Sequence, residues 1–378
     1  MFSKTLLPLL VLALSITEPV SGAVVRRSKC KPKSNIIHQA VDGSGMYEGI
    51  TKLNGWVEGA SVDVHGNIYA VDNQTFTSLY PSKTTKVVTA IDFSGNKDTH
   101  LAASRHTRTL GTLIGNANGK VIYTTKGDGK YENFIKSDEF LQPNDFTLDE
   151  DEKRLFFTGQ KWDKVSFKEH GEVGCIDTKT KKITKVPRAV LDKANTYRIN
   201  GIDLSPDDKY LYVTSERNIA NPDPTGEPLC TEQKIYRFNV PKEGCDLGAP
   251  TEWVDLNKAL AQHGIVDTKK KMDPDGLRTD DKGRVYVALN AFGMVMRITG
   301  PEFNEIIKTK TVANPSNLEF GHPEGNHVVI IGRCSGDSTS PLHSKACVDY
   351  LGINGVGRAY KNLNKGNKAG NGIEGKKD

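Results

Sequence analysis

The 378-residue chain carries 51 Lys and Arg against 46 Asp and Glu, so its formal net charge is only +5. This small and scattered excess argues against a nucleic-acid-binding protein, in which basic residues gather on one face. The exception is the segment 361–378, which is rich in Lys, Gly and Asn. Because such a composition cannot build a core, we expect a polar, disordered tail there.

The N-terminus has the pattern of a secretory signal. Met-Phe-Ser-Lys is followed by an apolar run from Leu6 to Ser15 and by small residues at 20–23. The run is too short to span a bilayer, and no later segment is long and apolar enough to do so. We therefore expect residues 1–23 to be a signal peptide and the mature protein to be secreted and extracellular, with no membrane or nucleic-acid partner, and to be a monomer.

A two-stranded sequence pattern recurs along the chain. It is a turn led by Asn, Asp or Glu, a strand, an acidic or Gly turn, and a second β-rich strand. Clear copies begin at Glu58, Asn144, Asn200, Asp275 and Asn317, and a weaker copy runs from Leu113 to Thr124. Some copies continue into a second hairpin, as at 173–186, so each unit makes four strands. Six units predict an all-β fold, a six-bladed β-propeller over residues 24–360. Short helical turns are expected at 189–194 and 256–261.

Six cysteines in a secreted chain predict disulfides, although 15 connectivities are open. Cys334 and Cys347 flank a short loop and could pair. Cys230 and Cys245 bracket a strand, which would hold them about 20 Å apart, so that pair is not favoured. Asn73-Gln-Thr75 is an N-glycosylation sequon and predicts a glycan at Asn73.

The residues that lead the repeats carry the functional argument. In a propeller the inner strands surround a central channel, so Glu58, Asn144, Asn200, Asp275 and Asn317 are expected to meet at one mouth. Oxygen donors without thiolate or imidazole favour a hard cation, and Ca²⁺ accepts carboxylate and amide oxygens in flexible geometry. The sequence thus predicts a metal-binding channel. The alternative is that Asn200-Gly and Asp275-Gly only form tight turns.

These residues also support a resemblance. Glu58-Gly…Asp63, Pro143-Asn-Asp145, Asn200-Gly…Ser205-Pro-Asp-Asp and Pro274-Asp-Gly276…Gly283-Arg-Val-Tyr-Val resemble the gluconolactonase/regucalcin (senescence marker protein) superfamily, which is related to diisopropylfluorophosphatase and paraoxonase. The resemblance covers roughly residues 40–360 and implies a six-bladed propeller with a channel calcium.

By position, the resemblance implies that Glu58, Asn144, Asn200 and Asp275 are metal ligands and that Asp275 is also catalytic. Sugar lactonases of the superfamily commonly place an Arg where this chain has Gln142, so a gluconolactone-like substrate is in doubt. His106 is a further candidate for the channel.

The resulting hypothesis is a secreted, calcium-dependent hydrolase of a lactone or related ester, with a small-molecule substrate. Asp275 could act as base, nucleophile or ligand only, because a bound cation lowers the basicity of a carboxylate. The first alternative is a non-catalytic propeller that binds a ligand or protein and holds a structural calcium. The second is a biosynthetic enzyme of the strictosidine synthase type.

Overall fold

A computed structural model of the chain describes residues 37–79, 89–270, 272–336 and 340–366. The predicted signal peptide, Cys30 and residues 367–378 of the predicted tail lie outside these ranges. The described part folds into six antiparallel sheets whose innermost strands, β3, β7, β11, β15, β19 and β23, each contact the next around a ring that β23 and β3 close. The predicted all-β, six-bladed propeller is confirmed.

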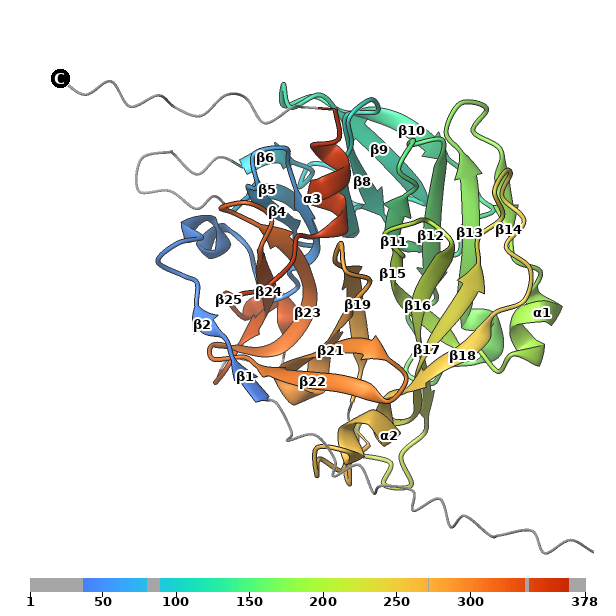
Figure 1. Ribbon diagram of the computed structural model, residues 1–378, viewed down its shortest axis with the longest axis vertical. Helices are drawn as coiled ribbons and strands as arrows, with labels where there is room; N and C mark the ends of the chain where they lie inside the picture. The colour runs from blue at the N-terminus through green and yellow to red at the C-terminus, as the bar shows by residue number, and fades with distance from the viewer. Residues whose placement is uncertain (1–36, 80–88, 271, 337–339, 367–378) are drawn as a thin grey trace, which may run out of the picture. The chain divides into compact units, whose positions relative to one another are not determined.

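In each blade the first-named strand lines the channel and the last-named strand lies outermost. Blade 1 contains β3 (Glu58–Val62), β4 (Ile68–Val71), β5 (Thr75–Ser78) and β6 (Thr89–Asp92). Blade 2 contains β7 (Leu101–His106), β8 (Thr112–Asn116), β9 (Val121–Thr125) and β10 (Glu132–Lys136). Blade 3 contains β11 (Pro143–Leu148), β12 (Arg154–Gln160), β13 (Gly171–Asp177) and β14 (Ile183–Lys185), which run side by side in Figure 1.

Blade 4 contains β15 (Arg198–Leu204), β16 (Tyr210–Ile219), β17 (Leu229–Asn239) and β18 (Thr251–Asp255). Blade 5 contains β19 (Pro274–Thr279), β20 (Val285–Leu289), β21 (Met294–Gly300) and β22 (Phe303–Lys308). Blade 6 contains β23 (Val312–Gly321), β24 (His327–Cys334), β25 (Ala346–Gly352) and the N-terminal strand β2 (Val41–Asp42).

The core lies between neighbouring blades, which explains the continuous apolar runs of the middle strands. In β20, Val285, Val287 and Leu289 pack into the cluster shared with blade 4, whereas Tyr286 and Ala288 pack into the cluster shared with blade 6. Because successive side chains of a strand point to opposite faces, a strand covered on both faces must be apolar at every position. This pattern fixes each blade against two neighbours.

The N-terminal segment completes the ring. β2 pairs antiparallel with β25 and supplies the outermost strand of blade 6, and β1 (Ile37–Gln39) pairs parallel with β22 of blade 5 (Figure 1). The repeats did not predict this closure, because two- and three-residue strands have no periodic signal. It joins the two ends of the described chain in one sheet.

The weak repeat at 113–124 does not contain the inner strand of its blade, so the prediction is wrong by one strand. Those residues form β8 and β9, the second and third strands of blade 2, and the inner strand is β7. β7 reads Leu-Ala-Ala-Ser-Arg-His and lacks both a leading Asx residue and a clear alternation. Its small, buried residues let neighbouring inner strands approach closely, and this is why it did not look like the other copies.

Helices are few and short. The two expected helical turns are α1 (Arg188–Lys193) and α2 (Leu256–Ala261), and single turns of 3₁₀ helix lie at Glu48–Lys52, Lys168–His170, Asn290–Phe292 and Pro341–His343. A third helix, α3 (Arg358–Leu363), crosses the expected start of the tail at 361, and its Leu363 is buried. The ordered chain therefore extends past the predicted boundary. None of the described helices is long and apolar enough to cross a bilayer.

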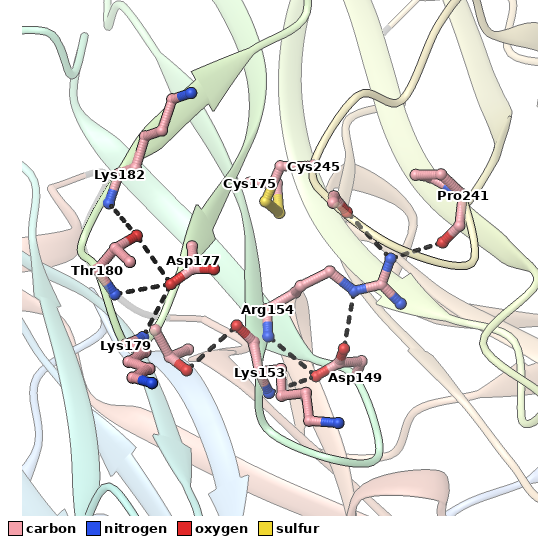
Figure 2. The surroundings of a disulfide bond; sticks show 12 residues. Asp149, Lys153, Arg154, Cys175, Asp177, Lys179, Thr180, Lys182, Pro241 and Cys245 are labelled. Carbon is pink, nitrogen blue, oxygen red and sulfur yellow. Dashed lines mark hydrogen bonds and ion pairs between the residues drawn. A yellow bond between two sulfur atoms is a disulfide. The ribbon is translucent and has the colours of Figure 1, made fainter.

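Two disulfides link described cysteines. Cys334 and Cys347, which the sequence allowed to pair, form one of them, between β24 and β25. Cys175 in β13 pairs with Cys245 in the loop after β17, and so ties blade 3 to blade 4. Beside this bridge, Arg154 donates to the Asp149 carboxylate and the Pro241 carbonyl (Figure 2). Cys230 is buried and forms no disulfide among the described residues.

The inter-blade bridge is expected to stabilise the fold more than the local one. Cys175 and Cys245 are 70 residues apart, whereas Cys334 and Cys347 are 13 apart. Closing these loops in the unfolded chain costs about 4 and about 3 kcal/mol of entropy, respectively. The double variant C175A/C245A should therefore lose more unfolding free energy in urea than its matched control C334A/C347A, and the reverse order would contradict this account.

Candidate metal centre at one mouth of the channel

A β-bulge occurs at the same level in all six inner strands. The register between each inner strand and its neighbour breaks around residues 58–61, 101–103, 143–145, 199–202, 274–277 and 315–317. A bulge re-aims side chains and bends the strand locally. Asn144, Asn200 and Asp275 fall inside these bulges. The alternative of tight turns is therefore wrong for Asn200-Gly and Asp275-Gly, which lie within strands β15 and β19.

The glycines that follow the candidate ligands allow neighbouring inner strands to touch. A Cβ on Gly201 would lie 2.4 Å from the carbonyl oxygen of Asp275, and a Cβ on Gly276 would lie 2.7 Å from Cγ of Asn317. No side chain fits at either place without moving a strand, so these positions require glycine for close approach. The close approach brings the candidate ligands of adjacent blades together.

The predicted residues meet at the mouth where the inner strands begin. Nδ2 of Asn144 donates to Oδ1 of Asn200 at 2.5 Å, and Nδ2 of Asn317 donates to Oε2 of Glu58 at 3.3 Å. Asn144, Asn200, Asn317 and Asp275 are all buried, and Glu58 keeps part of its side chain exposed. The structure thus joins two carboxylates and three amides, each from a different inner strand.

The two carboxylates lack a counter-charge. Burial, together with the charges of Asp145 and Asp273, raises the pKa of Glu58 to about 8. Burial and then the charge of Glu58 raise the pKa of Asp275 well above its usual range. Among the described residues no Lys, Arg or His forms an ion pair with Glu58 or Asp275. Buried carboxylates normally pair with a cation, so the site has the electrostatics of a metal centre.

One buried acceptor also lacks a partner. Nε2 of Gln160, at the end of β12, donates to Oδ1 of Asn144 at 3.1 Å, but Oε1 of Gln160 accepts no hydrogen bond from any described residue. An unsatisfied buried oxygen beside a ligand amide is costly unless a cation or water meets it. The donor set, all oxygen and net anionic, therefore fits a hard divalent cation, with Glu58, Asn144, Asn200 and Asp275 as the residues that would hold it.

The site is not a cluster of acidic or imidazole side chains. Within the described ranges, no three His, Cys, Asp or Glu residues come together in a way that could hold a metal. Three of the five residues at this level, Asn144, Asn200 and Asn317, are amides, so the site is defined by the repeats and not by a cluster of charged side chains. Neutral amide oxygens are ordinary ligands of Ca²⁺ and less suited to softer metals.

Asp275 is oriented by a chain of amides that sequence reasoning missed. Its Oδ2 accepts from Nδ2 of Asn290 at 3.1 Å, and Oδ1 of Asn290 accepts from Nδ2 of Asn314 at 3.3 Å. Oδ1 of Asn314 in turn accepts from the guanidinium of Arg333 at 2.9 Å. Asn290 follows β20 directly, so its place at the mouth could have been found from the end of that strand. The chain orients the Asp275 carboxylate through Oδ2 and leaves Oδ1 outside this chain of hydrogen bonds.

A second acidic pair lies behind the first. Burial, and then the charge of Asp273, raise the pKa of Glu216 well above its usual range, although Arg198 contacts the Glu216 carboxylate. Glu216 lies in β16 and Asp273 two residues before Asp275, so blade 4 and blade 5 add negative charge to the same mouth. Neither residue leads a repeat, and the sequence analysis did not identify them.

The remaining predicted residues do not belong to this set of candidate ligands. His106 ends β7, at the opposite end of the inner strand from the candidate ligands, where its Nδ1 lies 3.2 Å from Oγ of Ser61. Burial lowers the pKa of His106 to about 4, and its ring packs on Tyr69. Gln142 lies at the rim, where it bonds Asn118 and the Trp162 amide. Asn73 is partly exposed in the β4–β5 turn, and its glycosylation stays a prediction.

Below the site, six charged side chains close the channel. Arg278 bonds Asp145 at 2.7 Å and approaches Glu319 at 3.3 Å, and Arg105 bonds Glu319 at 2.7 Å. Arg358, from the start of α3, enters from the far end and bonds Asp203 at 3.4 Å. All six are buried, and their formal charges cancel. This network separates the candidate metal centre from the opposite mouth, which α3 covers.

Residues 56–331 match the model of the SMP-30/gluconolactonase/LRE-like region. The chain belongs to the SMP-30/gluconolactonase/LRE-like family. The match spans all six inner strands, from β3 to β23, and part of β24, and so includes every candidate ligand. No curated protein matches the chain.

Solved structures support the fold of this family member. A luciferin-regenerating enzyme is similar at 15% identity and a TM-score of 0.60, over 84% of this chain and 96% of that one. A calcium-binding protein, regucalcin, from Agrobacterium tumefaciens is similar at 14% identity and a TM-score of 0.55, over 85% and 97%. A gluconolactonase from Xanthomonas campestris is similar at 13% identity and a TM-score of 0.55, over 82% and 95%. At these identities the likeness concerns the fold.

Proposed function

We propose that this member of the family is a calcium-dependent hydrolase of a lactone or related carboxylic ester, secreted to the extracellular space. The observation that carries the proposal is a pair of carboxylates, the buried Asp275 and the partly buried Glu58, which share one mouth with Asn144 and Asn200. Neither has a cationic partner among the described residues. The gluconolactonase family supports an ester substrate, and the regucalcin with a similar fold is a calcium-binding protein.

The chain's own residues prepare the mouth for hydrolysis. A bound Ca²⁺ would supply a Lewis acid for the ester carbonyl. Glu58, Asn144, Asn200 and Asp275 would hold the ion. Asn290 fixes Oδ2 of Asp275, so Oδ1 can orient an attacking water by accepting its hydrogen bond. The ion network beneath the site closes the channel, so substrate and product share the upper mouth.

Calcium is expected to stabilise the protein through this site. At millimolar calcium and a dissociation constant of about 10⁻⁴ M, binding adds about 1.4 kcal/mol to the unfolding free energy. Thermal unfolding with calcium and with EDTA should show this difference, and Glu58→Gln should abolish it. Glu324→Gln, in the exposed β23–β24 turn, is the control and should keep it. An equal calcium effect in both variants would place the ion elsewhere.

Activity separates the hydrolase from a binding-only propeller. Purified protein should hydrolyse at least one member of a panel of lactones and aryl esters with calcium, and lose that activity in EDTA. Metal analysis of the same sample should find about one calcium per chain, as expected for a single site of this ligand number. Calcium-loaded, folded protein that is inactive on the whole panel would favour a structural ion in a non-catalytic propeller.

A further inference from the structure

Three aromatic rings gather beside the candidate metal centre. The indole of Trp56 lies 4.9 Å from the imidazole of His100 and 6.0 Å from the indole of Trp162, measured between ring centroids. Trp56 lies two residues before Glu58, His100 directly precedes β7, and Trp162 lies two residues beyond Gln160. The rings, which we call the aromatic wall, thus come from blades 1, 2 and 3 and meet at the mouth that holds the candidate ligands.

The wall occupies the side of the mouth that supplies no oxygen ligand. At the level of the bulges, β7 carries Ala102 and Ala103, and a Cβ on Gly59 would lie 2.7 Å from Ala103. The other five inner strands supply a carboxylate or an amide at this level. Blade 2 therefore supplies no ligand for an ion at this level. The rings beside blade 2 instead present a surface for the organic part of a ligand.

The wall is open and apolar. Trp162 has 40% of its surface exposed, so part of its indole is open to a ligand. The rings of Trp56 and His100 meet at 72°, and those of Trp56 and Trp162 at 65°. In an edge-to-face contact the edge of one ring covers one face of the other, so the exposed surface of Trp162 is the part of the wall that can stack on a ligand. By contrast Trp253, the third tryptophan of the chain, packs on Tyr212 at 4.7 Å in blade 4.

The polar groups near the wall are already paired or neutral. Oε1 of Gln142 accepts from the Trp162 amide at 3.2 Å, and its Nε2 donates to Asn118 at 3.3 Å. Burial lowers the pKa of His100, so its imidazole is uncharged at neutral pH. A polyhydroxylated ligand would have to replace these hydrogen bonds, whereas an apolar face gains ring contact without disturbing them.

We propose that the aromatic wall binds an aryl or alkyl face of the substrate, so that the enzyme selects apolar lactones or esters over polyhydroxylated ones. The inference rests on the proposed hydrolase function. It assigns Trp162 and Trp56 as residues that determine specificity. They lie beside the candidate metal centre, across the mouth from strand β19, which carries Asp275.

Kinetics with three lactones test the substrate class. The probes are dihydrocoumarin (a δ-lactone fused to benzene), unsubstituted δ-valerolactone and glucono-δ-lactone. We expect kcat/KM to be highest for dihydrocoumarin. Trp162→Leu should lower the dihydrocoumarin to δ-valerolactone ratio of kcat/KM about three- to tenfold, mainly through KM, because one aromatic contact is lost. Trp253→Leu, the matched control far from the mouth, should leave the ratio unchanged.

Two results would overturn the proposal. One is a ratio that Trp162→Leu does not change. The other is a preference for glucono-δ-lactone that depends on Trp162, which would make the wall a platform for a sugar. Titration with the corresponding benzo-fused lactam, with tryptophan fluorescence as the readout of binding, separates this inference from the hydrolase function. Binding that is lost in Trp162→Leu, in a protein without lactonase activity, would support the wall and refute hydrolysis; absence of binding together with normal hydrolysis would do the opposite.

Discussion

Asp275→Asn is expected to abolish calcium-dependent hydrolysis, with a fall in kcat/KM of at least about 10²-fold. The substitution keeps the shape of the side chain, and its new amide oxygen can still accept from Asn290, but it removes one of the two unpaired carboxylates at the mouth. The remaining charge on Glu58 then has to hold a divalent cation with neutral amides alone. Initial rates on the best substrate of the panel, measured across calcium concentrations, check this expectation.

The same variant should not unfold. Burial raises the pKa of Asp275, which means that the protein without metal bears a cost for an ionised group there. A neutral isostere removes this cost, so in EDTA the variant should be at least as stable as the parent, while the gain in stability on adding calcium should vanish. Asp128→Asn, in the exposed β9–β10 turn, is the control and should keep both activity and the calcium effect. A folded Asp275→Asn protein with near-normal turnover would contradict the assignment.

The repeats predicted the fold because five of the six blades obey the same local rules. The strand pattern that starts at Asn200 or Asp275 recurs with an Asx residue, a glycine and an apolar strand, and all three have structural causes: the bulge, the contact between inner strands, and burial on both faces. The order of the ring then places these residues at one mouth. Four predicted ligands and Asn317 could thus be brought together from sequence alone.

Contacts between distant segments could not be predicted in this way. β7 lacks the leading residue that identifies a blade, so the repeats did not locate this strand. His106 was therefore expected near the start of the blade, whereas it ends β7. Asn290 and Gln160 stand at the ends of second strands, where no repeat signal marks a role, although their side chains bond Asp275 and Asn144. The pairing of Cys175 with Cys245 depends on how two blades pack, and spacing carries no information about that.

Arg278→Met is expected to destabilise the protein by about 3–5 kcal/mol, the cost of leaving buried charges unpaired. Burial alone would lower the pKa of Arg278, but the carboxylates of Asp145 and Glu319 raise it on balance, so the guanidinium is charged and shared between them. All three side chains have 1% of their surface exposed. Methionine fills a similar volume and supplies no charge, so both carboxylates would lose this partner. Urea unfolding at neutral pH measures the change.

A second substitution shows whether charge or packing is responsible. In the double variant R278M/D145N one unpaired carboxylate is replaced by a neutral amide, so the double variant should be more stable than R278M alone. A change in side-chain volume cannot explain such a gain in stability, because Asp and Asn have nearly the same volume. The control is Lys153→Met, which breaks the 3.2 Å ion pair with Asp151 where the two side chains are 77% and 67% exposed. It should change stability by no more than about 0.5 kcal/mol, because solvent screens an exposed pair. If the double variant were less stable than R278M, the network would stabilise the protein by packing. The cancelling charges beneath the candidate metal centre would then need another explanation.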